Sequence, residues 1–202
     1  MKIVDLSKVS DSEADNFRQE VKLIESLQAL NSNRIIKLFD WEERPKTDDP
    51  DDGKELFVVM ELGESDLASV LKLINKDTRG LTDAKTKFYW GEMLETVEVV
   101  HSKDIVHKDL KPANFLIVKG MLKIIDFGIA SQVEDDKTHV TEINMMGTLN
   151  FMSPEAFPTT EGCGPRICPK ADVWSLGCIL YHMVYKKYPF GHIKQPIMKM
   201  QV

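Results

Sequence analysis

The chain has 202 residues, of which 43% are hydrophobic and 29% are charged, a composition typical of globular proteins with a sizeable core. Its formal net charge of −6 gives no bulk attraction to nucleic acid or to anionic membranes, and neither is an expected partner. No apolar run approaches the roughly 20 residues of a membrane-spanning helix, and the first residues lack the apolar stretch of a signal peptide. The three cysteines fit a reducing compartment, so an intracellular protein is expected.

The first sixty residues predict a strand, a helix and two further strands. The strands are expected over residues 2–6, 34–42 and 55–61. The helix should cover residues 11–30, with its N-cap at Asp11 or Ser12. Four apolar residues recur at helical spacing and should form its buried face: Phe17, Val21, Ile24 and Leu27.

A turn rich in proline, glycine and aspartate separates the second and third strands. Residues 45–53 contain two prolines, one glycine and four aspartates. Because these residues interrupt regular structure and keep their charges solvated, the segment is predicted to be an exposed hairpin loop. A functional acidic recognition tail is the alternative interpretation.

The remaining residues predict mainly helices. One helix should begin near Asp66, a second should cover residues 83–102, and the last should extend from Pro169 to about Tyr185. The second is expected to turn five apolar residues inward: Phe88, Met93, Leu94, Val97 and Val100. Short strands should flank Gly120, while residues 130–167 have little periodicity. Strands first and helices later predict an α+β fold of two lobes joined near residue 63.

Most of the functional information lies in residues 107–114, which read His-Lys-Asp-Leu-Lys-Pro-Ala-Asn. Twelve residues after Asn114 comes Asp-Phe-Gly at 126–128. This ordered pair matches the catalytic-loop and metal-binding signatures of protein kinases. The further elements Ser-Pro-Glu at 153–155 and Asp-Val-Trp-Ser-Leu-Gly at 172–177 make a chance match very improbable.

Each residue of this pattern has a chemical role in phosphoryl transfer. Asp109 would accept or orient the proton of the substrate hydroxyl, and Lys111 would pair with the transferring phosphate. Asn114 and Asp126 would hold Mg²⁺. Transfer needs positioning and charge neutralisation, so two metal ligands and one proton acceptor must converge on the γ-phosphate. The alternative is a surface aspartate and lysine in a polar turn.

Three further residues are expected to support this site. His107 could be a general base or a metal ligand, but we favour a packing residue that supports Phe127 and bonds to the backbone. Asp172 should brace the catalytic loop from the helix below. Cys163 and Cys168 lie in one loop, but without a completing histidine or cysteine they do not predict a zinc site.

Lys2 and Glu20 form a second candidate pair. Protein kinases tie a lysine on the third strand to a glutamate on the following helix, and this lysine reaches the α- and β-phosphates. Here Lys2 lies on a predicted strand, and Glu20 lies beside the inward-facing residues of the predicted helix. A solvated lysine near a chain terminus is the alternative.

Taken together, the chain resembles the eukaryotic protein kinase domain, and within it the monopolar-spindle (TTK-type) dual-specificity kinases. The similarity extends over nearly the whole chain, most clearly over residues 105–118, 120–130, 147–152 and 169–181. It implies transfer of phosphate from ATP, with Mg²⁺, to serine or threonine of proteins, with tyrosine as a further candidate acceptor. It also implies kinetochore or spindle proteins as partners, and a location in the nucleus, at the kinetochore or in the cytoplasm.

The resemblance also implies roles for individual residues. It makes Lys2 the third-strand lysine, with Glu20 as its partner, and Met60 the gatekeeper of the adenine pocket. Glu61 and Gly63 would offer backbone groups to adenine, with Leu116 and Ile125 as its floor. Thr138 and Thr141 would lie in the activation loop, and Thr148 in the segment that faces the substrate. Lys111 is typical of serine/threonine kinases.

The chain departs from the family pattern in several places. No Gly-x-Gly-x-x-Gly-x-Val loop precedes Lys2, and the later helices of the large lobe do not follow residue 190. Lys108 replaces the usual arginine, which weakens bidentate capture of a phosphothreonine. We therefore expect a partial kinase domain over residues 1–202, with residues 1–62 as a small-lobe remnant and residues 63–202 as a large-lobe portion. A truncated gene model is the favoured explanation.

Two other functions remain open at this point. The missing glycine-rich loop favours a catalytically inactive scaffold, whereas the intact Asp109, Asn114 and Asp126 favour an active kinase. A phosphotransferase for small molecules shares the aspartate base and the downstream asparagine, but the Ser-Pro-Glu element argues for protein substrates. A measurement of ATP turnover distinguishes the inactive scaffold from the active kinase. The identity of the phosphorylated product distinguishes a protein kinase from a small-molecule phosphotransferase.

Overall fold

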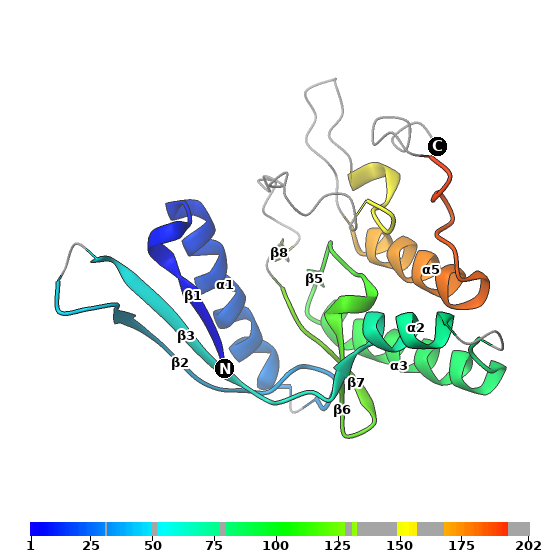
Figure 1. Ribbon diagram of the computed structural model, residues 1–202, viewed down its shortest axis with the longest axis horizontal. Helices are drawn as coiled ribbons and strands as arrows, with labels where there is room; N and C mark the ends of the chain where they lie inside the picture. Colours follow the sequence, from blue (N-terminus) through cyan, green and yellow to red (C-terminus); the bar gives the residue numbers. More distant parts are fainter. Residues whose placement is uncertain are drawn as a thin grey trace.

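The structure, a computed structural model, describes residues 1–30, 32–49, 52–76, 80–127, 131–132, 149–156 and 168–193. These residues fold into two parts that lie side by side, and the predicted α+β class is confirmed (Figure 1). One part holds a sheet and one helix, and the other holds the remaining helices with short strands. None of the helices in the described part has the length and apolarity that a membrane crossing requires.

The first part is a three-stranded antiparallel sheet that carries helix α1 (Asp11–Gln28). Its order is β1 (Lys2–Asp5), β3 (Lys54–Met60) and β2 (Leu38–Pro45), with Lys2 opposite Val58 in the register. The helix buries the predicted Val21, Ile24 and Leu27, with Phe17 packed against the same core. This packing fixes α1 beside the strand that carries Lys2.

The start of α1 corrects one prediction. The N-cap is Ser10, not Asp11 or Ser12, because Ser10 has extended backbone and forms a capping box with Glu13. The Ser10 hydroxyl accepts the N–H of Glu13, and the Glu13 carboxylate accepts the N–H of Ser10 at 2.9 Å. This bond holds the pKa of Glu13 below its ordinary value.

Strand β2 begins at Leu38, later than the predicted residue 34. Residues 34–37 are instead anchored to the second part of the molecule. Ile35 pairs with Ile124 in an isolated parallel bridge, and Ile124 donates its N–H to the Arg34 carbonyl at 2.9 Å. The Arg34 guanidinium also contacts the carboxylates of Glu92 and Glu95. These bonds join the two parts close to the candidate site.

The second part contains three longer helices and short strands. The helices are α2 (Leu67–Asn75), α3 (Asp83–His101) and α5 (Pro169–Tyr185). A second sheet has the order β4 (Ser65–Asp66), β6 (Phe115–Val118) and β7 (Met121–Ile124). A two-stranded sheet pairs β5 (Ile105–Val106) with β8 (Ser131–Gln132), and two short 3-10 helices among the described residues of this part are η3 (Pro112–Asn114) and η5 (Pro154–Ala156). A further 3-10 helix, η1 (Leu6–Lys8), lies in the first part between β1 and α1.

Helix α3 corrects a second prediction. Met93, Val97 and Val100 are buried as predicted, but Phe88 and Leu94 are 49% and 42% exposed. At about 100° per residue, Leu94 lies about 100° and Phe88 about 140° from Met93 around the helix axis. Thr96 completes the buried stripe instead, and its hydroxyl donates to the Glu92 carbonyl at 2.7 Å.

Candidate active site

Asp172 fixes the backbone of the catalytic loop from below. It lies in the first turn of α5 and is fully buried. Its carboxylate accepts the backbone N–H groups of His107 and Lys108, each at 2.9 Å, and contacts Nε2 of His101 at 2.8 Å. Lys108 has a φ of +70°, a conformation that costs energy for a residue with a side chain. The predicted brace is confirmed, and it holds this conformation in place.

Asp109 and Lys111 contact each other directly. The Lys111 ammonium lies 2.5 Å from Oδ2 of Asp109. The other oxygen, Oδ1, is buried and accepts no hydrogen bond from any described residue. A buried carboxylate oxygen without a partner is costly, so it is suited to accept a proton from an incoming group. This geometry fits the predicted proton acceptor, and the role itself remains a prediction.

Asn114 lies between the catalytic loop and the Asp-Phe-Gly segment. Its side-chain Nδ2 donates to the backbone carbonyl of Asp109 at 2.9 Å, and its backbone carbonyl accepts the N–H of Ile125 at 3.0 Å. The second bond brings the next residue, Asp126, close to Asn114. The Asp126 side chain is exposed, and its φ of +64° turns the backbone sharply at this point.

His107 is a packing residue, as predicted. Its ring lies 5.2 Å from the ring of Phe127, and its Nε2 lies 3.4 Å from the Ile125 carbonyl. Complete burial lowers the pKa of His107, so its imidazole is neutral at physiological pH. The interpretation as a metal ligand has no support among the described residues, where no cluster of three His, Cys, Asp or Glu side chains occurs.

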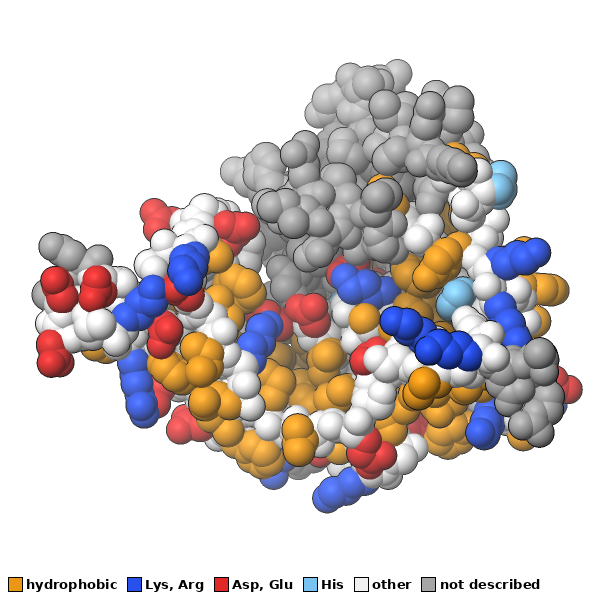
Figure 2. Space-filling view, viewed as in Figure 1, with side chains coloured by type: hydrophobic (Ala, Val, Ile, Leu, Met, Phe, Trp, Pro, Cys, Tyr) orange, Lys and Arg blue, Asp and Glu red, His pale blue; other side chains and the backbone are white. Residues whose placement is uncertain are grey.

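The structure brings Lys2 and Glu20 together. Lys2 Nζ lies 3.5 Å from Oε2 of Glu20, and the Glu20 side chain is only 7% exposed. Burial raises the pKa of Glu20, the charge of Lys2 opposes this effect, and the charge of Asp126 adds to it. The charge of Asp126, in the second part of the molecule, therefore acts on Glu20 in the first part. Figure 2 shows the surface hollowed between the parts, with hydrophobic side chains at its bottom.

The predicted adenine-binding residues lie at the end of β3, in the connector that follows it, and in and beside β6 and β7. Met60 ends β3, and Leu116 and Ile125 pack against the core. A Cβ on Gly63 would lie 2.2 Å from the Leu116 side chain, so only glycine allows the connector to approach β6 this closely. The segment from Met60 to Gly63 therefore packs directly against strand β6 at Gly63.

Lys123 is a residue that the sequence interpretation missed. Although it is a lysine, it is buried in β7, and its Nζ lies 2.7 Å from Oε2 of Glu61. The same oxygen accepts the N–H of Lys37 at 3.1 Å, and the N–H of Glu61 donates to the Lys37 carbonyl at 2.8 Å. Burial alone would raise the pKa of Glu61, but the bonds from Lys123 and Lys37 hold it below its ordinary value. The signal in the sequence was a lysine within a short apolar strand, Met121–Ile124, where a buried lysine needs an acidic partner.

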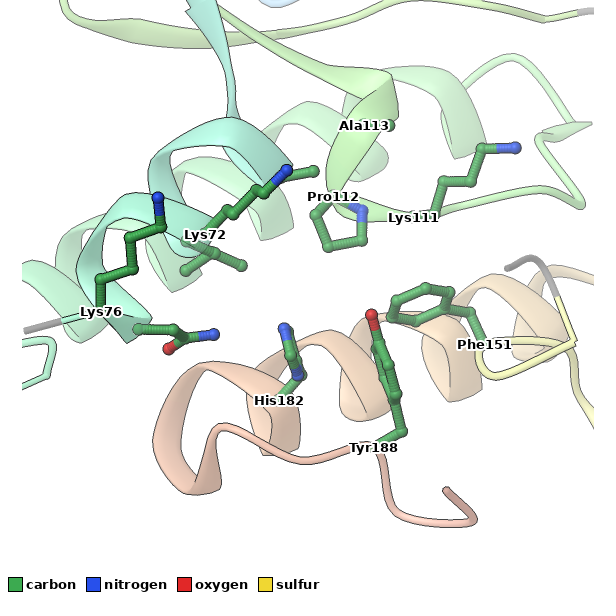
Figure 3. A pocket seen from close by; sticks show the side chains of 11 residues that line it. Lys72, Lys76, Lys111, Pro112, Ala113, Phe151, His182 and Tyr188 are labelled. Atoms are coloured by element: carbon green, nitrogen blue, oxygen red, sulfur yellow. The ribbon is translucent and has the colours of Figure 1, made fainter. Parts of the chain in front are cut away.

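A pocket of about 530 Å³ lies beside the catalytic loop, between α2 and α5 (Figure 3). Pro112 and Ala113 of the loop form one wall, and the His182 ring stacks on Tyr188 at 4.5 Å on the other side. The other lining residues are Ala68, Leu71, Lys72, Asn75, Lys76, Lys111 and Phe151. The lining is mostly apolar and includes three lysines.

Some predicted site residues lie outside the described residues. These are the three candidate regulatory threonines, Thr138, Thr141 and Thr148, together with Gly128 and Cys163. Their roles remain predictions. The residues that the structure describes bring Lys2, Glu20, Asp109, Lys111, Asn114 and Asp126 to one region of the molecule.

Comparisons with known proteins agree with this geometry. A model of the family described as protein kinase domain matches residues 1–202. Dual specificity protein kinase TTK of Mus musculus is 39% identical over 99% of this chain and 22% of its own length. The corresponding kinase of Danio rerio is 42% identical over 98% of the chain and 19% of its own length. Serine/threonine-protein kinase mph1 of Schizosaccharomyces pombe is 41% identical over 96% of the chain and 28% of its own length. The chain thus spans 19% to 28% of the length of these relatives.

Proposed function

Because the chain belongs to the protein kinase family, we propose that it transfers the γ-phosphate of ATP to serine or threonine of proteins, with tyrosine as a further candidate acceptor. The observation that carries this proposal is the connected set of bonds that runs from Lys111 through Asp109 and Asn114 to Ile125, next to Asp126. It supports the proposal because phosphoryl transfer requires a proton acceptor, a cation and oxygen ligands for metal to converge, and these are the roles proposed for Asp109, Lys111, Asn114 and Asp126.

The residues present fit ATP and a magnesium ion. Mg²⁺ prefers oxygen ligands and is usually bound by one or two protein groups together with phosphates and water. The Asp126 carboxylate is exposed, and the Asn114 amide uses its nitrogen for the Asp109 carbonyl, which leaves its oxygen available as a ligand. Mg²⁺, when bound here, would neutralise charge on the β- and γ-phosphates.

The chain's own residues then have distinct tasks. Asp109 Oδ1 accepts the proton of the substrate hydroxyl, while Oδ2 holds Lys111 next to the transferring phosphate. Lys2, oriented by Glu20, binds the α- and β-phosphates. The backbone of Glu61 and Gly63 would bind adenine, and the apolar side chains of Leu116 and Met60 would line its site.

The protein substrate is proposed to approach from the side of the pocket described above. This pocket shares Lys111, Pro112 and Ala113 with the catalytic loop, so its occupant would lie within reach of Asp109. By family resemblance, kinetochore or spindle proteins are the candidate partners in a spindle-checkpoint role. The corresponding location is the nucleus, the kinetochore or the cytoplasm.

The test is phosphate transfer by the purified full-length protein. Incubation with Mg-ATP labelled at the γ-phosphate and with a general protein substrate should yield phosphoserine or phosphothreonine. Asp109→Asn should abolish the label, and Lys103→Met, which changes an exposed lysine just before β5, should not. Label on a small molecule but never on protein would contradict the proposal, as would undiminished transfer by Asp109→Asn.

A further inference from the structure

The connector between β1 and α1 is held by a side chain from the neighbouring hairpin. This connector is η1, and it joins the strand of Lys2 to the helix of Glu20. Lys46, which follows β2 directly, places its Nζ 2.7 Å from Oδ2 of Asp5 and donates to the Ser7 hydroxyl at 3.0 Å. The side chains of Lys46 and Asp5 are only 23% and 20% exposed.

The backbone of the same hairpin also lies against the connector. The N–H of Lys46 donates to the Gly53 carbonyl at 3.1 Å, which closes the hairpin at this level. Gly53 has a φ of +83°, and a Cβ there would lie 2.7 Å from Cβ of Ser7. On the connector side, Oδ1 of Asp5 accepts both the N–H and the hydroxyl of Ser7. We call the contacts among Asp5, Ser7, Lys46 and Gly53 the connector clasp.

We propose that the connector clasp positions α1, and that Lys46 is a positioning residue for the ion pair between Lys2 and Glu20. This inference rests on the proposed function for its effect on ATP, but not for its effect on α1 itself. Asp5 ends the strand that carries Lys2, and Ser10 caps the helix that carries Glu20. A bond to the residues between them therefore sets the distance and angle between strand and helix.

The ion pair needs such external support. Lys2 and Glu20 are joined by one contact of 3.5 Å, and the lysine is 41% exposed. Burial of Glu20 favours its neutral form, so the pair contributes little to holding the helix in place. A second bond from the same hairpin acts in the same direction, because Nε of Arg18 on α1 contacts the Glu43 carboxylate on β2 at 2.6 Å. The hairpin is thus bonded both to the connector before α1 and to the middle of α1.

Two measurements on the full-length protein test the proposal. The first is amide hydrogen exchange over residues 6–14, which requires no activity. Lys46→Met should accelerate exchange there, while Lys46→Arg, which keeps the charge, and Lys22→Met, which changes an exposed lysine on α1, should match the wild type. Unchanged exchange in Lys46→Met would overturn the proposal.

The second measurement is the dissociation constant of Mg-ATP, compared in two backgrounds. Lys46→Met should weaken binding by roughly two- to fivefold in the wild type, the range expected for a partly exposed ion pair. The same change should have no effect in Lys2→Met, since the pair through which it acts is already lost. An equal loss in both backgrounds would show that Lys46 acts elsewhere and would overturn the proposal. If the wild type bound no Mg-ATP, the proposed function would fail, and the exchange result would still decide the clasp.

Discussion

The catalytic loop and the Lys2–Glu20 pair serve the same candidate site, but the molecule holds them in different ways. The loop is bonded from below by the fully buried carboxylate of Asp172, which accepts two backbone N–H groups. The pair depends on one 3.5 Å contact and on hairpin contacts near the surface. Bonds in the interior are strong and not easily exchanged, whereas bonds near the surface are weak and adjustable. We therefore expect substitutions around the loop to have large effects and substitutions around the pair to have graded ones.

Asp109→Asn should have the largest effect. The amide cannot accept the hydroxyl proton and no longer attracts Lys111, so kcat should fall by about 10³-fold. The protein should remain folded, because the buried Oδ1 makes no bond that the fold requires. Steady-state kinetics with a protein substrate and thermal unfolding are the two measurements. A kcat near the wild-type value would refute the assignment of Asp109 as the proton acceptor.

Asp172→Asn should come next, and here stability should change first. The N–H groups of His107 and Lys108 bond to different oxygens of Asp172, so the amide group of asparagine puts a donor against one of the two and leaves it unpaired. The free energy of unfolding should fall by about 2–3 kcal/mol. Urea unfolding measures this loss, and Asp83→Asn, at the exposed first turn of α3, is the matched control. If both variants unfolded at the same urea concentration, the brace would not stabilise the loop.

Glu20→Gln should separate function from stability. The folded-state pKa of Glu20 is raised, so its contribution to stability is present at low pH and is lost as the pH rises through that value. At neutral pH the charged carboxylate is therefore a cost, and the amide should leave stability unchanged or increase it. Turnover at low ATP should nevertheless fall on the order of tenfold, because Lys2 loses its charged partner. A lower melting temperature at pH 7 would contradict this expectation, and the wild type should lose stability as the pH rises from the ordinary pKa of a glutamate through the raised pKa of Glu20.

Much of the site could be predicted because phosphoryl transfer requires fixed residue types at fixed spacings. Asp109, Asn114 and Asp126 are close in sequence, and the structure brings them close in space. The pairing of Lys2 with Glu20 followed from the same pattern, although it bridges a strand and a helix. The kinase sequence pattern could not predict contacts between residues that are distant in sequence and lie outside its motifs. Lys46 reaches Asp5 across 41 residues, and Lys123 reaches Glu61 across 62.

The errors in the fold have a similar cause. Ser10 is the N-cap of α1 because its backbone is extended. The sequence offers several neighbouring Ser and Asp residues and does not show which of them has this conformation. Phe88 and Leu94 are apolar, but the contacts of α3 with β7 and α5 select a different stripe of the helix. Composition indicates that a helix is partly buried, and only its neighbours decide which face is buried.

Lys123→Met should have the smallest of these effects. It tests the segment from Met60 to Gly63 rather than the catalytic loop or the Lys2–Glu20 pair. The Lys123 ammonium and the Lys37 N–H hold one oxygen of Glu61, whose backbone is proposed to bind adenine. Loss of the ammonium leaves the half-buried Glu61 carboxylate with one donor fewer, so the segment from Met60 to Gly63 should lose its preferred orientation. KM for ATP should rise about fivefold while kcat changes little, because the phosphates and the hydroxyl are held by other residues. Lys103→Met, which changes an exposed lysine just before β5, is the control. A fall in kcat at constant KM would mean that Lys123 acts on the catalytic loop, since β7 continues directly into Ile125 and Asp126.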